Sequence, residues 1–164
     1  MFNPYNHERC SSALIRAYDQ QIRPNVYAVG HLERCLWDSD LGLGRPASVE
    51  AYDDTAYRLL ANVSKRLLGK SAYRKRPQER RRLPNMVTLE SFGDRPHLNI
   101  LIHKPERFSF EQLENALREE WGVLPWTNKL TGSLWIQPRT GDCVRYALKE
   151  GYESLLPRSL SFHS

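Results

Sequence analysis

The sequence lacks several features that would place it in a common class of protein. Its three cysteines, Cys10, Cys35 and Cys143, are far apart and form no CxxC pair, so neither a zinc site nor a disulfide framework is expected. No stretch approaches the roughly 18 to 20 apolar residues that a membrane span requires. A GxxxxGK[ST] nucleotide-binding motif is also missing, which excludes an ATP-driven motor from this chain.

The first residues, MFNPYNHERC, lack the apolar region of a secretory signal. We therefore expect a soluble, cytoplasmic protein with reduced thiols and no membrane partner. The 164 residues, 40% of them hydrophobic, suit a single domain with a sizeable core. The core of that domain is expected at about residues 25–155.

Positive charge is concentrated in one segment. The formal net charge is only +5, with a pI near 9.2, but nine Lys or Arg residues stand between Lys65 and Arg82 against the single acid Glu79. A charge run is usually a solvated face or a loop. The density of this one, within residues 65–84, favours contact with a phosphate backbone. The candidate nucleic-acid-binding side chains are Arg74, Lys75, Arg76, Arg80, Arg81 and Arg82.

Periodicity and turn residues predict the first elements. A helix is expected around residues 11–21, followed by a strand at 25–30 that is rich in β-branched and aromatic residues. The Gly, Asp and Pro residues of DSDLGLGRPAS, from Asp38, predict a loop. Apolar residues then recur at helical spacing between Ser48, a candidate N-cap, and Gly69, which would end the helix.

Two β-rich runs follow the basic segment. MVTLE ends at Glu90 and HLNILIH begins at His97, with FGDRP between them, and a Gly-Asp pair between such runs signals a hairpin. Glu90 should therefore lie across the hairpin from His97 or near it. Ser109 opens a predicted helix over SFEQLENALREEW. SLWIQP, at 133–138, is the next strand, and GDCVRYALKEGYESLL supplies a last helix.

The resulting order, β, α, β, β, α, β, α, is that of an α+β protein with a ferredoxin-like or split βαβ core, an antiparallel sheet and an added C-terminal helix. Such a sheet can carry helices on one face and leave the other face open. Because side chains alternate along a strand, His97 and Asn99 should lie on the open face, and Leu98 and Ile100 on the core face.

Downstream, YALK places Tyr146 and Lys149 three residues apart in the last predicted helix, so their side chains share a helical face. A metal-ready imidazole, a phenol and a cation are the groups needed to break a phosphodiester and to hold the product. RPHLNILI and YALK together resemble the HUH endonucleases. The resemblance is closest to the rolling-circle replication initiators and related nucleases of plasmids, phages and mobile elements that nick with a single tyrosine. It covers about residues 26–152.

The resemblance implies a role for each matching residue. In the family, two histidines separated by a hydrophobic residue bind a divalent cation on a central strand, often with a nearby carboxylate. His97 matches the first histidine, and Asn99 stands where the second belongs. An amide oxygen is a reasonable ligand for Mg²⁺ or Mn²⁺, and Glu90 is the candidate carboxylate. Tyr146 matches the nucleophile and Lys149 matches the lysine of the motif.

These roles define an expected reaction. A divalent ion held by Glu90, His97 and Asn99 would polarise the scissile phosphate. Tyr146 would attack in line and leave a 5′-phosphotyrosine and a free 3′-hydroxyl. Because the pKa of a free tyrosine is near 10, the metal and Lys149 would have to favour the phenolate. Lys149 could instead clamp the phosphate.

Each candidate also has a simpler interpretation. His97 could be a surface or hydrogen-bonded histidine, and Tyr146 could be a packing residue, because aromatic side chains at helical spacing are usually core. Tyr152 is a rival nucleophile. Aromatic side chains that could stack on unpaired bases are Tyr73, Trp126 and Trp135.

The sequence therefore predicts metal-dependent nicking and rejoining of single-stranded DNA or a DNA hairpin, in replication or mobilisation of a plasmid, phage or mobile element. Unwinding would need a partner such as a host helicase, because the chain has no motor motif. Two alternatives stay open. One is a catalytically inactive nucleic-acid-binding regulator on the same fold, in which Asn99 replaces a histidine. The other is a structural protein whose basic segment contacts a protein or RNA partner.

Overall fold

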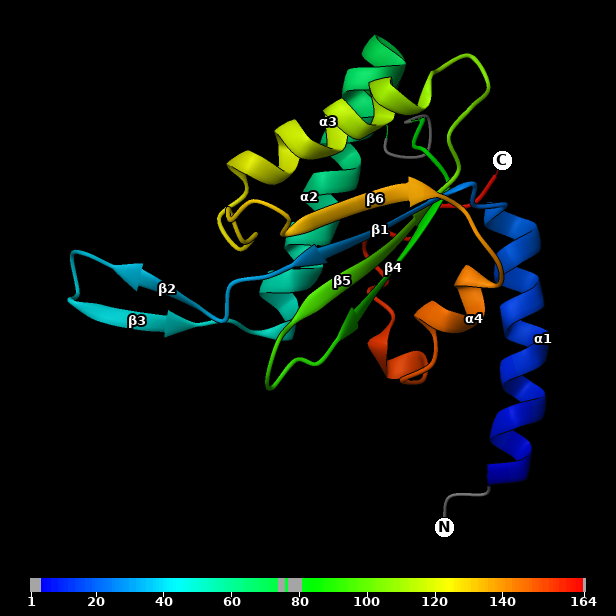
Figure 1. Cartoon of the computed structure of the whole chain (residues 1–164), viewed down its shortest axis with the longest axis horizontal. Helices are drawn as coiled ribbons and strands as arrows, with labels where there is room; N and C mark the ends of the chain where they lie inside the picture. Colours follow the sequence, from blue (N-terminus) through cyan, green and yellow to red (C-terminus); the bar gives the residue numbers. More distant parts are fainter. Residues whose placement is uncertain (1–3, 74–75, 77–80, 164) are drawn as a thin grey trace.

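The protein is an α+β structure built on a four-stranded antiparallel sheet. The sequence predicted this fold class and an antiparallel sheet. The computed structural model describes residues 4–73, 76 and 81–163. Across the sheet the strands follow the order β4, β5, β1, β6 (Figure 1). These strands are β1 Val26–His31, β4 Asn85–Glu90, β5 His97–Ile102 and β6 Leu134–Pro138. The helices are α1 Pro4–Ile22, α2 Val49–Leu68, α3 Phe110–Val123 and α4 Cys143–Ala147.

Each long connection of the sheet passes over a neighbouring strand. The chain runs from β1 through α2 to β4, with β5 lying between those two strands, and from β5 through α3 to β6, with β1 lying between them. A short turn joins β4 to β5, and their register pairs Glu90 with His97. The predicted hairpin and its register are therefore confirmed.

Helices α2 and α3 cover one face of the sheet, and local sequence signals set where they begin and end. Ser48 caps α2 by accepting a hydrogen bond from the Ala51 N–H, and Gly69 follows the helix with a φ of 63°. Ser109 and Gln112 form a capping box at the start of α3. Against these helices pack strand residues that include Val26, Ala28, Val87, Leu98, Ile100, Ile102, Leu134 and Ile136.

The opposite face is not open, which corrects the sequence-based expectation. Helices α1 and α4 pack on it and form a second, smaller core with Tyr27, Met86 and Leu101 of the strands. The physical reason is that these three side chains place apolar surface on this face, and removing that surface from water is favourable. The polar residues of the face, His97 and Asn99, precede Leu101 at alternate positions along β5.

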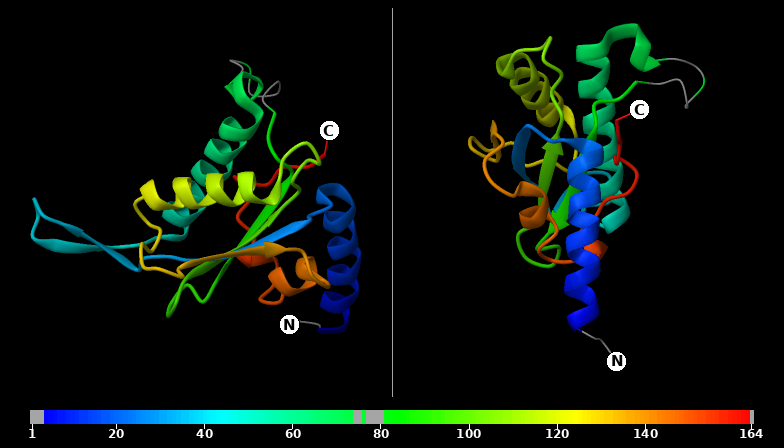
Figure 2. Two further views of the ribbon diagram at one scale, coloured as in Figure 1. Left: turned by 45° about the horizontal axis from the view of Figure 1, so that its top comes forward. Right: turned by 90° about the vertical axis from the view of Figure 1, so that its right-hand side faces the viewer.

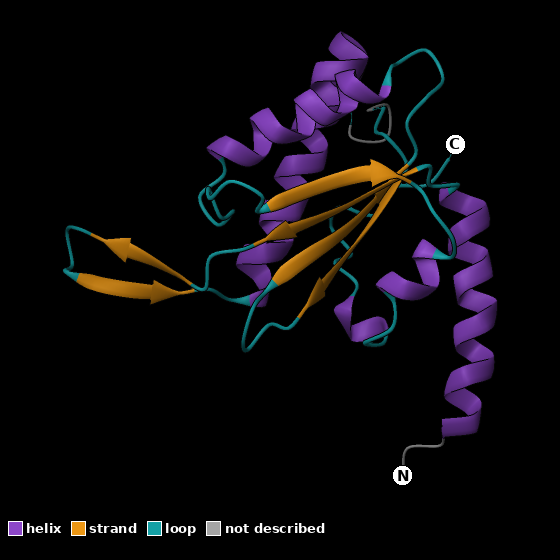
Figure 3. Cartoon of the chain, viewed as in Figure 1, coloured by secondary structure: helices purple, strands orange, loops and turns teal. Residues whose placement is uncertain are grey.

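A separate two-stranded ribbon replaces the loop predicted from Asp38. It consists of β2 (Cys35–Asp38) and β3 (Leu43–Pro46) and projects from the rest of the molecule (Figure 2, Figure 3). The prediction was wrong because β3 is exposed along its whole length, so it carries no alternation of apolar and polar residues. Trp37 on this ribbon is 72% exposed.

Two helix boundaries also differ from the prediction. α1 begins at Pro4 rather than near residue 11. The last helix ends at Ala147, and Lys149 lies in the turn that follows, where its N–H still bonds to the Tyr146 carbonyl. Among the helices of the described residues, none has both the length and the apolar character needed to span a bilayer.

Candidate functional site

The β4–β5 hairpin brings Glu90, His97 and Asn99 together. Glu90 ends β4, His97 lies opposite it as the first residue of β5, and Asn99 follows on the same face. Glu90 Oε2 is 3.1 Å from His97 Nε2, and Glu90 Oε1 accepts a 2.7 Å hydrogen bond from Asn99 Nδ2. Glu90 and Asn99 are buried, whereas 19% of the His97 side chain is exposed. The three residues predicted as ligands therefore converge at one point.

A tyrosine that the sequence did not indicate holds the amide in place. The Tyr27 hydroxyl donates a 2.7 Å hydrogen bond to Asn99 Oδ1. Burial, and then the proximity of Tyr146 and Glu90, raise the pKa of Tyr27, so its hydroxyl keeps its proton and remains a donor. Alternation within the predicted strand places Tyr27 on one face, but the pairing of β1 beside β5 has no local signal.

Helix α4 carries Tyr146 over the same face of the sheet. Asp142 caps this helix by accepting a hydrogen bond from the Arg145 N–H. The Tyr146 ring lies nearly perpendicular to the Tyr27 ring, with the two centroids 6.2 Å apart. Half of the Tyr146 side chain, 51%, is exposed. The phenol is therefore on the same side of the sheet as the imidazole and can be reached from solvent.

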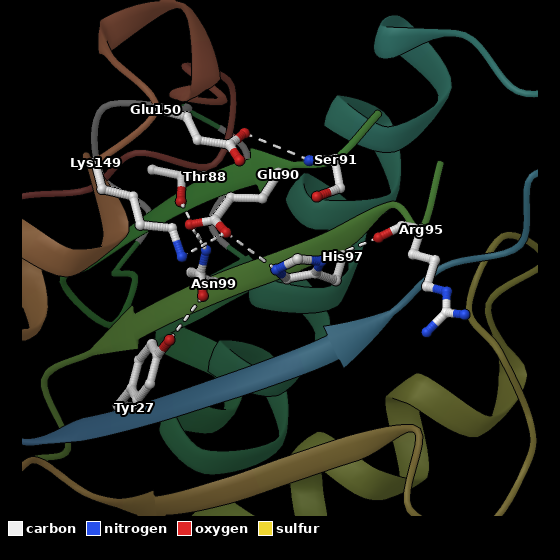
Figure 4. A network of polar contacts seen from close by, with 9 residues as sticks. All are labelled: Tyr27, Thr88, Glu90, Ser91, Arg95, His97, Asn99, Lys149 and Glu150. Atoms are coloured by element: carbon white, nitrogen blue, oxygen red, sulfur yellow. Dashed lines mark hydrogen bonds and ion pairs between the residues drawn. The ribbon is translucent and has the colours of Figure 1, made fainter. Parts of the chain in front are cut away.

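Lys149 joins the phenol to the carboxylate. Its Nζ is 3.9 Å from the centroid of the Tyr146 ring and 3.1 Å from Glu90 Oε2. A side-chain hydrogen bond with Tyr146, and further contacts with Glu90, raise the pKa of Lys149 against the opposing effect of desolvation. The ammonium group is therefore charged at neutral pH. Figure 4 shows Lys149 and His97 approaching Glu90 from different sides, with Asn99 between Glu90 and Tyr27.

A divalent cation bound at this cluster would take its ligands from Glu90, His97 and Asn99, whose amide now turns its nitrogen toward Glu90 and its oxygen toward Tyr27. Two ligands at right angles, each ~2.1 Å from an octahedral ion, lie about 3.0 Å apart, close to the 3.1 Å between Glu90 Oε2 and His97 Nε2. Turning the Asn99 amide over would direct its oxygen to the Glu90 side, and the Tyr27 hydroxyl could then accept from its nitrogen. Such a site would need the amide as its third ligand, because the described residues contain no group of three or more His, Cys, Asp or Glu side chains that could hold a metal.

Tyr152 and a further histidine of the chain, His103, lie outside this cluster. Tyr152, the rival nucleophile, starts the short 3-10 helix Tyr152–Ser154, and its hydroxyl is buried. The ring of His103 contacts the Arg23 carbonyl at 2.7 Å and packs on His163. Neither side chain is placed to act on a phosphate at the Glu90 cluster.

One cation counted in the basic segment has a structural role. Arg66 of α2 forms ion pairs with Glu119 and Glu120 of α3. Asn62, one turn earlier on α2, also donates a hydrogen bond to Glu120. These contacts join the two helices that cover the larger core, so Arg66 contributes to the fold.

The predicted nucleic-acid-binding arginines are described only in part. Arg76 and Arg81 are exposed, and Arg82 donates a 2.7 Å hydrogen bond to the Tyr57 hydroxyl. Arg81 and Arg82 line a cavity of about 370 Å³ with Tyr57 and Lys65. Outside the described residues lie Arg74, Lys75 and Arg80.

The aromatic candidates for base stacking differ in exposure. Trp126 is only 6% exposed and packs edge-on against Tyr52, so its proposed role in stacking was wrong; its indole belongs to the core. Trp135 is 48% exposed and remains a candidate. The side chain of Tyr73 lies outside the described part of the chain.

Comparisons with known proteins assign neither a family nor a function to the chain. No protein-family model, no curated protein and no solved structure matches the chain. What the protein does is therefore inferred from the contacts described above.

Proposed function

We propose that the protein nicks and rejoins single-stranded DNA, or the single-stranded part of a DNA hairpin, through a covalent link to Tyr146. One observation carries the proposal: an exposed phenol and an ammonium group from the α4 region meet a carboxylate, an imidazole and an amide from the β4–β5 hairpin. The biological setting would be replication or mobilisation of a plasmid, phage or mobile element. A partner such as a host helicase would supply unwinding.

The arrangement of the sheet supports the same proposal. In a ferredoxin-like core of the HUH type, the residues that bind the divalent cation stand on a central strand and the nucleophile on a downstream helix. Here β5 lies between β4 and β1 and carries His97 and Asn99, and α4 follows β6 in the chain. The two long connections around α2 and α3 support a split βαβ core.

In the proposed reaction, the Tyr146 hydroxyl oxygen attacks the scissile phosphorus in line. A bond forms between this oxygen and phosphorus, and the bond from phosphorus to the 3′-oxygen breaks. The phenol gives up its proton and the departing 3′-oxygen takes one up, so the products are a 5′-phosphotyrosine and a 3′-hydroxyl. Attack by a 3′-hydroxyl on the phosphotyrosine reverses these steps and rejoins the strand.

The other side chains hold and orient the reacting groups. The Lys149 ammonium, in contact with the Tyr146 ring, favours the phenolate by its charge. Tyr27 fixes the Asn99 amide, and the hairpin fixes the separation of Glu90 and His97. A divalent Mg²⁺ or Mn²⁺ ion bound by the carboxylate, imidazole and amide would supply Lewis-acid polarisation of the phosphate.

The experiment is incubation of the protein with single-stranded DNA and Mn²⁺, followed by denaturing electrophoresis. We expect a covalent protein–DNA adduct that is lost in Tyr146→Phe. Tyr152→Phe is the matched control, because its hydroxyl is buried, and it should form the adduct as the wild type does. An adduct that survives Tyr146→Phe would refute Tyr146 as the nucleophile.

A second candidate function has its own supporting observation. The Glu90 carboxylate already interacts with Asn99, His97 and Lys149, so its charge is compensated without a metal. A catalytically inactive DNA-binding regulator on the same fold would show salt-sensitive binding without cleavage. Asn99→His separates the two functions: in a nuclease it should tighten Mn²⁺ binding and increase cleavage, and in a regulator no cleavage appears.

A further inference from the structure

Beside Tyr146 lies a groove whose lining residues, apart from Tyr146 and Tyr27, have no role in the reaction described above. It has a volume of about 450 Å³, within the range of pockets that hold small organic groups. The residues that line it include Tyr27, Trp135 and Gln137 from the strands and Thr140, Asp142 and Tyr146 from the segment that leads into and through α4. The groove therefore begins at the proposed nucleophile and extends along β6.

Trp135 offers this groove a large aromatic surface that the fold does not need for its core. Its neighbours Leu134 and Ile136 point to the opposite face and are buried, whereas Trp135 is 48% exposed. The Tyr27 ring meets the Trp135 ring edge-on at a centroid distance of 6.1 Å and the Tyr146 ring at 6.2 Å. Tyr27 therefore packs against both exposed rings.

Polar groups at the groove complement this aromatic surface. The Gln137 amide provides both donors and an acceptor, and its contact with Thr140 Oγ1 is long, 3.4 Å, so the amide can exchange it for a better partner. Asp142 accepts hydrogen bonds from Arg145. A planar ligand with hydrogen-bonding groups on its edge matches such a groove.

We propose that the groove holds one base of the DNA strand, adjacent to the scissile phosphate and stacked on Trp135. The identity of the strand rests on the proposed nicking function, because the groove shares Tyr146 with that site. Stacking on an indole is open to every base, whereas the Gln137 amide can favour particular base edges. The groove would thus fix the position of the phosphate relative to Tyr146 and contribute to the choice of nicking site.

The test is equilibrium binding of labelled oligothymidylate and of a mixed-sequence single strand, measured by fluorescence anisotropy without divalent metal so that the DNA stays intact. Trp135→Leu should weaken binding by about 5- to 150-fold, the loss that corresponds to one stacked base. Trp135→Phe keeps an aromatic face and should recover most of the affinity. Trp37→Leu is the matched control, since Trp37 is exposed on the ribbon and does not line the groove.

Walking a single abasic nucleotide along the strand locates the stacked base. The wild-type protein should lose affinity when the abasic nucleotide occupies the position of the stacked base. The affinity of Trp135→Leu should not depend on the abasic position. Equal affinities of wild type and Trp135→Leu for both strands would overturn the proposal, even if the Tyr146 adduct forms. If Trp135→Leu weakens DNA binding but no Tyr146 adduct forms, the base site is supported and the proposed nicking function is refuted.

Discussion

Replacing Lys149 with methionine should destabilise the protein in the absence of metal and, at the same time, tighten its binding of Mn²⁺. The Lys149 ammonium lies 3.1 Å from Glu90 Oε2, the same oxygen that lies 3.1 Å from His97 Nε2. Without metal, this cation compensates a carboxylate that is only 2% exposed. A metal ion that uses Oε2 must first displace it.

The size of both effects follows from the exposure of the two partners. A hydrogen bond to a charged group contributes about 1.5–3 kcal/mol, but exposed ion pairs contribute only about 0–1 kcal/mol. Glu90 is buried and 42% of the Lys149 side chain is exposed, so we expect an intermediate loss of ~1–2 kcal/mol in the free energy of unfolding. In the variant, Mn²⁺ no longer has to break this ion pair in order to bind Glu90. A gain of the same ~1–2 kcal/mol in binding free energy corresponds to about 5- to 30-fold tighter Mn²⁺ binding.

The assay combines urea unfolding in a chelating buffer with Mn²⁺ titration by calorimetry. Arg145→Met is the matched control, because it removes a cation from the same segment whose partner, Asp142, is exposed and outside the Glu90 cluster. Its Mn²⁺ affinity should equal that of the wild type within about twofold. Unchanged or weaker Mn²⁺ binding by Lys149→Met would show that the ammonium does not compete for Glu90, and the reasoning would fail.

Three further predictions concern stability and DNA affinity. Burial, and then the neighbouring His97, lower the pKa of His31, so the free energy of unfolding should fall as the pH drops below about 6.5. His31→Gln should reduce this loss, which is measured by comparing urea midpoints at neutral and acidic pH. Gly30→Ala would place a methyl group 2.2 Å from the Trp121 ring and should lower the free energy of unfolding by about 1–3 kcal/mol; a thermal midpoint equal to the wild type would contradict this. Arg81→Ala should weaken DNA binding similarly for all sequences and reduce the slope of log affinity against log salt by about 0.7 for single strands, and an unchanged slope would exclude this side chain as a phosphate contact.

Local signals in the sequence sufficed for the part of the site that lies on one hairpin. Strand alternation and the turn between MVTLE and HLNILIH predicted that Glu90 faces His97, because both depend on residues close in the chain. The helices after Ser48 and Ser109 were predicted for the same reason, since capping is decided within one turn.

The rest of the site depends on contacts between distant segments. Tyr27 and Asn99 are far apart in the chain, and nothing in either segment shows that β1 lies beside β5. Helices were predicted near the positions of α1 and α4, but nothing local in either segment shows which face of the sheet a helix packs on, so the covering of the second face was missed. Trp126 follows a predicted helix and Trp135 lies in a predicted strand, but only the packing of the sheet shows that Trp126 enters the larger core and that Trp135 points away from it.

The position of the basic segment limits how DNA can engage the proposed site. Arg81 lies just before Asn85, the first residue of β4, whereas Glu90 is the last. At ~3.3 Å per residue the two ends of this strand are about 16 Å apart, the length of about five stacked nucleotides at ~3.4 Å each. Arg81 also lies beside α2, which covers the other face of the sheet from Tyr146. A DNA strand that contacts Arg81 would therefore reach Tyr146 only several nucleotides later. It follows that Arg81→Ala should raise the DNA concentration needed for half-maximal adduct formation and leave the rate at saturating DNA unchanged; a lower saturating rate would place this arginine close to the scissile phosphate and refute the inferred path.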